Sequence, residues 1–435
     1  MSPILNCPAL LISATASAQG KTTITAALAW HFRQQGMNVQ VFKTGPDFLD
    51  PKILEVASGR PVYQLDLWMV GEDQCRQLLY RAAKGVDLIL IEGVMGLFDG
   101  QPSSAELAKY FAIPVLAVID ASAMAGTFAA IAHGLSSFDK NLSLAGVLAN
   151  RVGSDAHGNM LRDTLPPHIK WFGALKQQND ISLPERHLGL YSANEISDLH
   201  QRLEHASRIL THSGLGDLAS FTRVTFKATE NSPTPPPLLK NVRIGIARDA
   251  AFCFCYPANL DLLADLGASL VYFSPMSDTE LPPIDSLYLP GGYPELHLQT
   301  LQNNRAMKNA IRHHFESNKP IVAECGGLLY LMDSITDSAG NSAQMTGILA
   351  GKAEMQTRWV NLSMQRIKLT AGEIRGHSFH YSVIHDTIKP SDTSIVNGKY
   401  GQPEAVYRTK RLFASYMHLY MPSSPLATAE IFSPA

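Results

Sequence analysis

Four consecutive residues near the start of the chain have the chemistry of a phosphate-binding loop: Gly20, Lys21, Thr22 and Thr23. Glycine lets the backbone approach a phosphate closely, lysine adds a point charge, and the first threonine hydroxyl can ligate Mg²⁺. The usual G-x-x-x-x-G-K-[ST] pattern has glycine where this chain has Thr15, so the match is partial. We predict a phosphate site here. The alternative is a strand-to-helix turn that contains the Gly-Lys-Thr sequence by chance.

Cys325 is the second residue with evident chemistry. It lies between an apolar run at 320–323 and a helix-like segment, and Gly326 and Gly327 follow it. We expect the positive end of that helix to lower the pKa of the thiol, and the two glycines to allow a sharp turn that exposes the sulfur. These features predict a nucleophilic cysteine, and an inert buried cysteine is the alternative.

A nucleophilic cysteine needs an oxyanion hole and a base. Backbone N–H groups of Gly326 and of the loop that contains Gly291 and Gly292 are suited to bind an oxyanion in acyl transfer. The residues alone leave three histidines open as the base: His377, His380 and His418.

Carboxylates follow two expected strands of the first half of the chain. Asp47 and Asp50 lie in the loop after the strand at 38–43, and Glu92 ends the apolar run at 86–92. Nucleotide-binding domains place a Mg²⁺-organising carboxylate directly after a buried strand, downstream of the phosphate loop. Glu92 has this position, so it is favoured over Asp99. The alternatives are that the first two acids only form a turn and that Asp99 only caps a helix.

Arg186 and His187 are candidates for contacts with an anion, because a guanidinium binds a carboxylate with two parallel hydrogen bonds. Isolated residues of these types are often only surface charges.

The elements that must position these residues alternate between buried strands and helices. Strand-like apolar runs lie at 10–12, 38–43, 86–92, 113–120 and 144–151, with helical segments between them. This pattern predicts a doubly wound α/β domain with its ligands at the carboxyl ends of the strands. A second series of runs lies at 242–247, 269–273, 286–289 and 320–323, with a helix expected at 259–266.

The clearest boundary is the proline cluster at 231–237. Its composition is typical of a semi-rigid linker, and 435 residues exceed what one hydrophobic core normally serves. We therefore predict a first domain at 1–230, a linker at 231–240 and a second domain at 241–435.

Composition narrows the function classes. Apolar residues make up 46% and charged residues 17%, with a formal net charge of −2 and no long run of one sign, so nothing favours nucleic acid or an anionic membrane as a partner. Five cysteines without C-x-x-C spacing argue against a disulfide framework and favour a reducing cytoplasm. We expect neither a signal peptide nor a membrane span.

Together these residues resemble a known family, the cobyrinic acid a,c-diamide synthases, which are two-domain amidotransferases of corrinoid biosynthesis. The resemblance extends over nearly the whole chain and is carried by long motifs: SAQGKTT, FKTGPDFLDP, IEGVMGLFDG, LANRVGSDAHG, LPERHLGL, RDAAFCFCYPANL, LPGGYPELH, ECGGLLYLM, RGHSFHYS and ASYMHLY. It implies two doubly wound α/β domains, a P-loop domain like dethiobiotin synthetase and a C-terminal class I (triad) glutamine amidotransferase domain.

The resemblance also implies roles for individual residues. Cys325 would form a γ-glutamyl thioester and release ammonia, with His418 as its base. ATP would bind at Gly20, Lys21, Thr22 and Thr23, and Mg²⁺ at Thr22, Asp47 and Glu92. The acyl phosphate or the acid substrate would contact Asp99, Arg186 and His187, while Gly292 and Gly326 would form the oxyanion hole.

The sequence departs from the family pattern at two positions. Ala18 stands where the family usually has glycine, which we expect to stiffen the phosphate loop. Tyr420 stands two residues after His418, where many class I amidotransferases have glutamate and this family usually has histidine. The second departure leaves open which group orients His418.

The implied reaction is the ATP- and glutamine-dependent amidation of the a and c acetate carboxylates of cobyrinic acid, through an acyl phosphate. A possible homodimer follows from the family alone. Related substrates, hydrogenobyrinic acid or nickel-sirohydrochlorin, are alternatives, and cobyric acid synthesis fits the motifs less well. From a different class, a P-loop ATPase switch with an inactive amidotransferase-like domain is also open.

Overall fold

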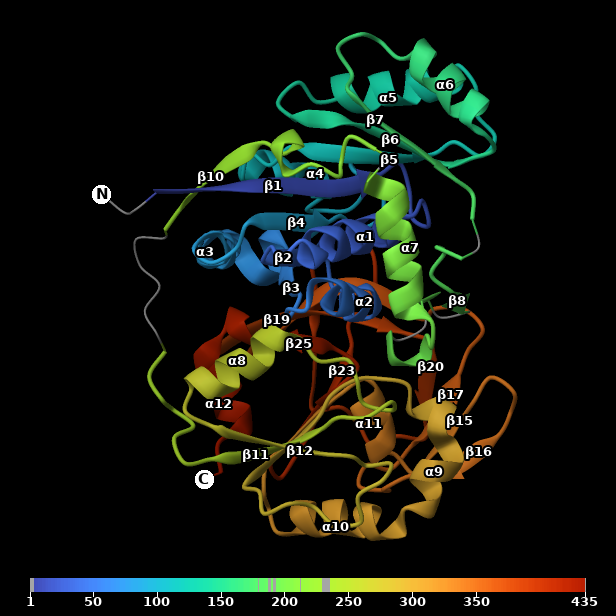
Figure 1. Ribbon diagram of the computed structural model, residues 1–435. Helices are drawn as coiled ribbons and strands as arrows, with labels where there is room; N and C mark the ends of the chain where they lie inside the picture. The colour runs from blue at the N-terminus through green and yellow to red at the C-terminus, as the bar shows by residue number, and fades with distance from the viewer. Residues whose placement is uncertain are drawn as a thin grey trace. The chain divides into compact units, whose positions relative to one another are not determined.

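The computed structural model describes residues 4–178, 180–186, 189–190, 193–211, 213–228 and 235–434 (Figure 1). The chain divides into two compact units, Met1–Ser232 and Pro233–Ala435, which are considered separately below. In the part of the chain that is described, no helix is long and apolar enough to cross a membrane.

The N-terminal unit is built on a sheet with the strand order β3-β2-β4-β1-β5-β6-β7, in which all of these strands are parallel. Its eighth strand, β10, pairs antiparallel with the first half of β1. The strands are β1 (Ile4–Ala14), β2 (Val39–Thr44), β3 (Tyr63–Leu65), β4 (Leu88–Glu92), β5 (Val115–Asp120), β6 (Leu144–Val152), β7 (Trp171–Lys176) and β10 (Arg223–Lys227). A short hairpin adds β8 (Glu185–Arg186) and β9 (Gly189–Leu190).

Helices cover both faces of this sheet, as the alternation along β5 shows. Leu116 and Val118 pack in the core that includes α1, α2 and α7, whereas Ala117 and Ile119 pack in the core that includes α5 and α6. The helices are α1 (Lys21–Gln34), α2 (Leu49–Ser58), α3 (Glu72–Ala83), α4 (Ser104–Tyr110), α5 (Thr127–Ser137), α6 (Asp155–Thr164) and α7 (Leu199–Thr211). The prediction of a doubly wound domain is confirmed for this unit.

The C-terminal unit has a central sheet with the order β12-β11-β13-β14-β24-β23-β21. Its first five strands are parallel, and β23 and β21 continue it antiparallel. The strands are β11 (Arg243–Ala247), β12 (Ser269–Phe273), β13 (Ser286–Leu289), β14 (Ile321–Glu324), β21 (Asp392–Thr393), β23 (Ala405–Thr409) and β24 (Leu412–Ser415). The helices are α8 (Pro257–Asp265), α9 (Leu298–Asn303), α10 (Arg305–Glu316), α11 (Gly326–Leu331) and α12 (Pro425–Phe432).

This central sheet also has two covered faces. On β13, Leu287 and Leu289 belong to the core beside α10 and α11, and Tyr288 belongs to the core beside α8 and α12. The expected strands at 269–273 and 286–289 are the observed β12 and β13. The expected helix at 259–266 begins earlier, because Pro257 is well suited to the first turn of a helix.

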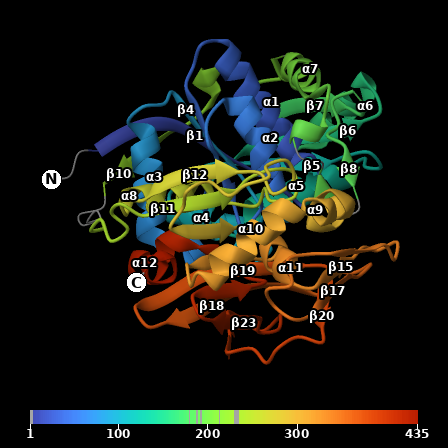
Figure 2. The same cartoon turned by 90° about the horizontal axis from the view of Figure 1, so that it is seen from below.

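Two further four-stranded sheets of the C-terminal unit were not predicted, and Figure 2 labels β15, β17 and β20 of one and β18 and β19 of the other. One has the order β16-β15-β17-β20 and the other β22-β18-β19-β25. The strands are β15 (Ser334–Thr336), β16 (Ser342–Gln344), β17 (Lys352–Met355), β18 (Asn361–Leu369), β19 (Gly372–His380), β20 (Ser382–His385), β22 (Ile395–Val396) and β25 (His418–Tyr420). The second sheet matters for function, because β19 and β25 bring the candidate histidines together.

Candidate active sites

The phosphate loop lies between β1 and α1. Gly20 precedes α1 with φ 96°, a conformation that favours glycine, and an added Cβ would lie 2.3 Å from Asn150 Nδ2. Asn150 donates a hydrogen bond to the carbonyl of Gln19 at 2.9 Å, so the end of β6 holds this loop in place. Ala18 also has a positive φ, 59°, which costs a residue with a side chain about 1 kcal/mol or more.

Lys21 spans the phosphate loop. Its ammonium donates to the carbonyl oxygens of Ala16 at 2.9 Å and Met95 at 2.7 Å. Burial lowers its pKa to about 8, and the positive charge of Lys43 adds to this effect. In a phosphate-binding loop the lysine at this position is the group that reaches the β- and γ-phosphates.

Three carboxylates surround one buried ammonium at the carboxyl ends of β2 and β4. Lys43 Nζ lies 2.6 Å from Asp50, 2.8 Å from Glu92 and 3.5 Å from Asp47. The Thr22 hydroxyl donates to the same Glu92 oxygen at 2.7 Å. Burial raises the pKa of both Asp47 and Glu92. For Asp50 burial acts in the same direction, but the charge of Lys43 and the hydrogen bonds of the carboxyl group together lower the pKa.

Sequence reasoning missed Lys43 as part of this site. The signal available was a lysine at the end of the predicted strand at 38–43. The sequence did not indicate that Glu92 is its partner, because the pairing of Lys43 with Glu92 depends on β2 and β4 being neighbours in the sheet.

The residues present fit a Mg²⁺ ion that is shared with phosphates. In the described ranges, no group of three or more His, Cys, Asp or Glu side chains is arranged to hold a metal by itself. Oε2 of Glu92 is buried and makes no hydrogen bond there, so one carboxylate oxygen beside Thr22 remains for an ion or its water shell. Mg²⁺ commonly binds through one or two carboxylates, water and substrate phosphates, which suits this donor set.

A cavity of about 620 Å³ lies in the N-terminal unit over these groups. Its volume is typical of a site for a small-molecule ligand. Residues that line it include Gly20, Lys21, Thr22, Thr23, Lys43, Asp47, Asp50, Glu92, Asn150, Arg151 and several residues between 175 and 183.

Of the other predicted substrate residues, Asp99 has a described side chain, and it is not among the residues that line this cavity. Asp99 accepts a hydrogen bond from the backbone N–H of Gly96 at 2.9 Å and is absent from the cavity lining, although its charge raises the pKa of Lys21. Arg186 lies in β8, and nothing is described of its side chain. His187 lies outside the described residues.

Cys325 occupies the sharp turn between β14 and α11. Its backbone has φ 45° and ψ −108°, outside the ordinary regions for a residue with a side chain, and its N–H donates to the Ser415 carbonyl at 2.9 Å. Strain of this kind is characteristic of functional turns. The expected low pKa is wrong for this state: burial raises the pKa of the thiol, and the Gly326 N–H opposes burial only in part.

The two glycines predicted for the oxyanion hole lie in contact. A Cβ on Gly326 would lie 3.0 Å from the backbone N of Gly292. Gly292 itself has φ 158°, and a Cβ there would lie 2.1 Å from the carbonyl oxygen of Ala251. The two backbones are therefore adjacent, as the predicted oxyanion hole requires.

We expect Gly292→Ala to lower the free energy of unfolding of the C-terminal unit by about 1–3 kcal/mol, because its methyl group must displace a backbone carbonyl. Gly340→Ala is the matched control: its φ is also positive, 86°, but no atom lies within 4 Å of the added carbon. Urea unfolding measures both. Equal losses in the two variants would show that the contact with Ala251 is not what requires glycine.

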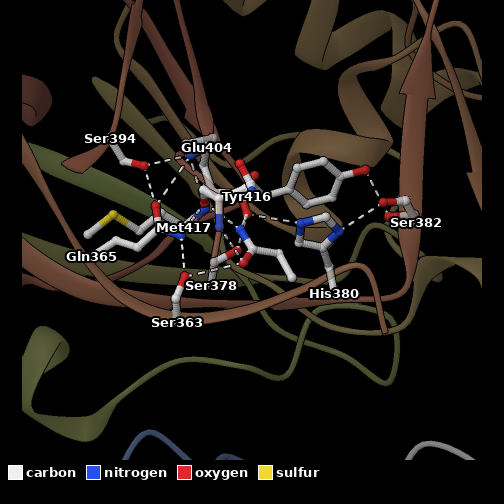
Figure 3. A network of polar contacts seen from close by, with 12 residues as sticks. Ser363, Gln365, Ser378, His380, Ser382, Ser394, Glu404, Tyr416 and Met417 are labelled. Carbon is white, nitrogen blue, oxygen red and sulfur yellow. Dashed lines mark hydrogen bonds and ion pairs between the residues drawn. The ribbon is translucent and has the colours of Figure 1, made fainter. Parts of the chain in front are cut away.

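The hydrogen bonds of His380 exclude it as the base (Figure 3). Its Nδ1 lies 2.8 Å from the Ser382 carbonyl and its Nε2 3.0 Å from the Glu404 carboxylate. Both partners are acceptors, so each ring nitrogen already has a partner and neither is placed to take a proton from a thiol. Ser378 also donates to Glu404; burial opposes these contacts, but they hold the pKa of Glu404 below its usual range.

His418 lies beside the oxyanion loop. A Cβ on Gly291 would lie 2.3 Å from its Cε1 atom, and its ring stacks on that of His377 at 4.9 Å and 16°. His377 and His418 are direct partners across β19 and β25, and Nδ1 of His377 lies 3.0 Å from the Tyr256 hydroxyl. Burial lowers the pKa of His418 to about 3, so its ring is neutral and can accept a proton.

Two family models match the chain, one in each unit. Residues 10–190 match the CobQ/CobB/MinD/ParA nucleotide binding domain, and residues 243–425 match the CobB/CobQ-like glutamine amidotransferase domain. Both predicted domain types are thereby confirmed.

Similar proteins extend over the full length. A hydrogenobyrinate a,c-diamide synthase of Stutzerimonas stutzeri is 57% identical, covering 99% of each chain, and one of Pseudomonas aeruginosa is 54% identical, covering 99% of this chain and 98% of the relative. A cobyrinate a,c-diamide synthase of Herminiimonas arsenicoxydans is 45% identical, covering 100% and 98%. The chain belongs to the family of cobyrinate and hydrogenobyrinate a,c-diamide synthases.

Proposed function

We propose that this chain catalyses the ATP- and glutamine-dependent amidation of the a and c acetate carboxylates of a corrin acid, with Mg²⁺ as cofactor. The observation that carries the proposal is the presence of two different sites in one chain. One has the groups for activating a carboxylate with ATP, and the other has the groups for releasing ammonia from glutamine.

The N-terminal site supports phosphoryl transfer. A carboxylate does not accept ammonia at neutral pH, so ATP must first convert it to an acyl phosphate. Lys21 would hold the β- and γ-phosphates, with Thr22 and Glu92 beside the bound Mg²⁺, which spreads the negative charge of the group in transfer. Lys43 would keep Asp47, Asp50 and Glu92 in position in the lining of the cavity.

The C-terminal site supports a cysteine glutaminase. Sγ of Cys325 would lose its proton to His418 and attack the side-chain carbonyl of glutamine, while Gly292 and Gly326 donate to the oxyanion. His418 would then return the proton to the leaving nitrogen, so that ammonia departs and a γ-glutamyl thioester remains. Water hydrolyses the thioester to glutamate, and ammonia displaces phosphate from the acyl phosphate.

Two candidate substrates differ in whether the macrocycle contains a metal. Cobyrinic acid is the substrate implied by the sequence, and hydrogenobyrinic acid is the second candidate. The two relatives at 57% and 54% identity carry the hydrogenobyrinate name, which favours the metal-free ring. A cytoplasmic location and a homodimer stay predictions.

The test is product analysis with Mg-ATP, glutamine and either macrocycle, alone and in competition. We expect two amides, two ADP and two glutamate per macrocycle, and the preferred macrocycle shows the higher kcat/KM. ATP turnover without any amide product would contradict the proposal and favour an ATPase switch.

A further inference from the structure

The base of the proposed glutaminase has no carboxylate at the usual place in the sequence. In the His-x-Glu arrangement of class I amidotransferases, position 420 would hold that carboxylate, but this chain has tyrosine there. Tyr420 is fully buried, and its ring packs edge-on against Tyr256 at 5.7 Å and 68°. A phenol cannot stabilise an imidazolium as a carboxylate does.

A different carboxylate lies next to His418. Glu324 is the last residue of β14 and directly precedes Cys325, and its Oε2 lies 4.0 Å from His418 Nδ1. Both side chains are only 2% exposed. In the described part of the chain, His418 is the one basic side chain within ion-pair distance of Glu324.

In its buried environment, the carboxylate of Glu324 is stabilised by a positively charged group or a hydrogen-bond donor. Its Oε1 is buried and makes no hydrogen bond to the described residues. Burial raises the pKa of Glu324 well above its usual range, while the Tyr288 hydroxyl and the Leu419 N–H oppose this effect. A buried carboxylate with an unused oxygen is costly unless it acts on a neighbour, and the neighbour here is His418.

We propose that Glu324 is the positioning residue for His418, in place of the glutamate of the His-x-Glu arrangement. Its carboxylate holds the proton on Nδ1 of His418, so that Nε2 is the unprotonated nitrogen and accepts the proton from Sγ of Cys325. The S–H bond breaks, an N–H bond forms, and the electron pair stays on sulfur for the attack on glutamine. This inference rests on the proposed roles of Cys325 and His418.

The distance of 4.0 Å between Oε2 of Glu324 and Nδ1 of His418 is what we expect in the absence of substrate. Hydrogen bonds between catalytic groups are often long before the substrate binds and shorten in the loaded enzyme. A movement of about 1 Å would bring Oε2 and Nδ1 to the 2.7–2.9 Å of a charge-assisted hydrogen bond. The adjacency of Glu324 and Cys325 means that one turn positions both the nucleophile and the group that orients its base.

Other charged and titratable groups around His418 are committed elsewhere. His377 stacks on the face of the His418 ring, where it cannot reach the in-plane Nδ1 of His418. Its own Nδ1 forms a hydrogen bond with the Tyr256 hydroxyl. His380 is paired with Glu404, and its charge lowers the pKa of His418. Glu324 is therefore the carboxylate placed to act on the imidazole edge.

The test uses the full chain and compares the two nitrogen donors. We expect Glu324→Gln to lower kcat of glutamine-dependent amidation by at least about 10²-fold, since loss of the orienting carboxylate costs serine hydrolases this much or more. The KM for glutamine should stay within about threefold, and ammonia-dependent amidation should be unchanged. Glu324→Asp, which keeps the charge, should recover part of the loss.

A pH profile separates orientation from mere packing. A carboxylate stabilises a nearby imidazolium, so the acid limb of the wild-type profile reports the Glu324–His418 pair, and its loss should move that limb at least about one pH unit lower in Glu324→Gln. Tyr420→Phe is the control and should keep glutamine-dependent activity within about threefold.

Three results would overturn the inference. They are full activity of Glu324→Gln with glutamine, equal losses with glutamine and ammonia, or an unshifted acid limb. If Glu324→Gln does not fold, Glu324→Asp decides by the same profile. Failure of the proposed function would look different: Cys325→Ala would then retain glutamine-dependent activity.

Discussion

Replacing Cys325 with alanine should reduce glutamine-dependent amidation by at least about 10³-fold, because a nucleophile acts as a unit with its base and oxyanion hole. Amidation with ammonia should stay within about twofold of the wild type. The alanine lacks only the sulfur, and the N-terminal phosphate site uses none of the groups of this turn. The measurement is the rate of amide formation with each nitrogen donor at saturating Mg-ATP.

Cys75→Ala is the matched control for this experiment. Cys75 is also a fully buried cysteine that forms no disulfide, but it lies in α3 of the N-terminal unit. Its loss should leave the ratio of glutamine-dependent to ammonia-dependent rates unchanged. If Cys325→Ala loses both activities, the cysteine is required for the fold rather than for the glutaminase.

Replacing Lys21 with methionine should reduce amidation by at least about 10³-fold with either nitrogen donor, because the charge of the transferring phosphoryl group loses its nearest cation. Methionine has a similar length, so packing in the loop is largely kept. Lys52→Met is the control, since Lys52 pairs with Glu55 within α2 and is not among the residues that line the cavity. Retained activity of Lys21→Met would show that another group binds the phosphates.

The same lysine gives ATP binding a pH dependence. Its pKa in the free enzyme is about 8, so above this pH the ammonium loses its proton, whereas bound phosphates favour the charged form. ATP binding must then take up a proton, and the apparent Kd should rise by up to about tenfold per pH unit above pH 8. Calorimetry in buffers of different ionisation enthalpy measures this uptake, and Lys21→Met should abolish it.

Local patterns in the sequence were enough to locate both sites. The strand-turn-helix layouts around Lys21 and Cys325 depend on residues that are near each other in the chain, such as the glycines of each turn and the apolar run before it. The strands β12 and β13 were predicted for the same reason, because alternation and turn residues are local properties. The two small sheets of the C-terminal unit were missed because most of their strands have only two to four residues.

The arrangement of side chains within each site was decided by the tertiary structure. Lys43 meets Glu92 because β2 and β4 are neighbours in register, and nothing in either segment specifies that neighbour. The choice among the three histidines depended on which of them already had acceptors at both nitrogens and which lay on Gly291. The sequence by itself determined the chemistry available at each turn; the order and register of the strands decided which distant groups complete it, because those contacts are made across strands and not along the chain.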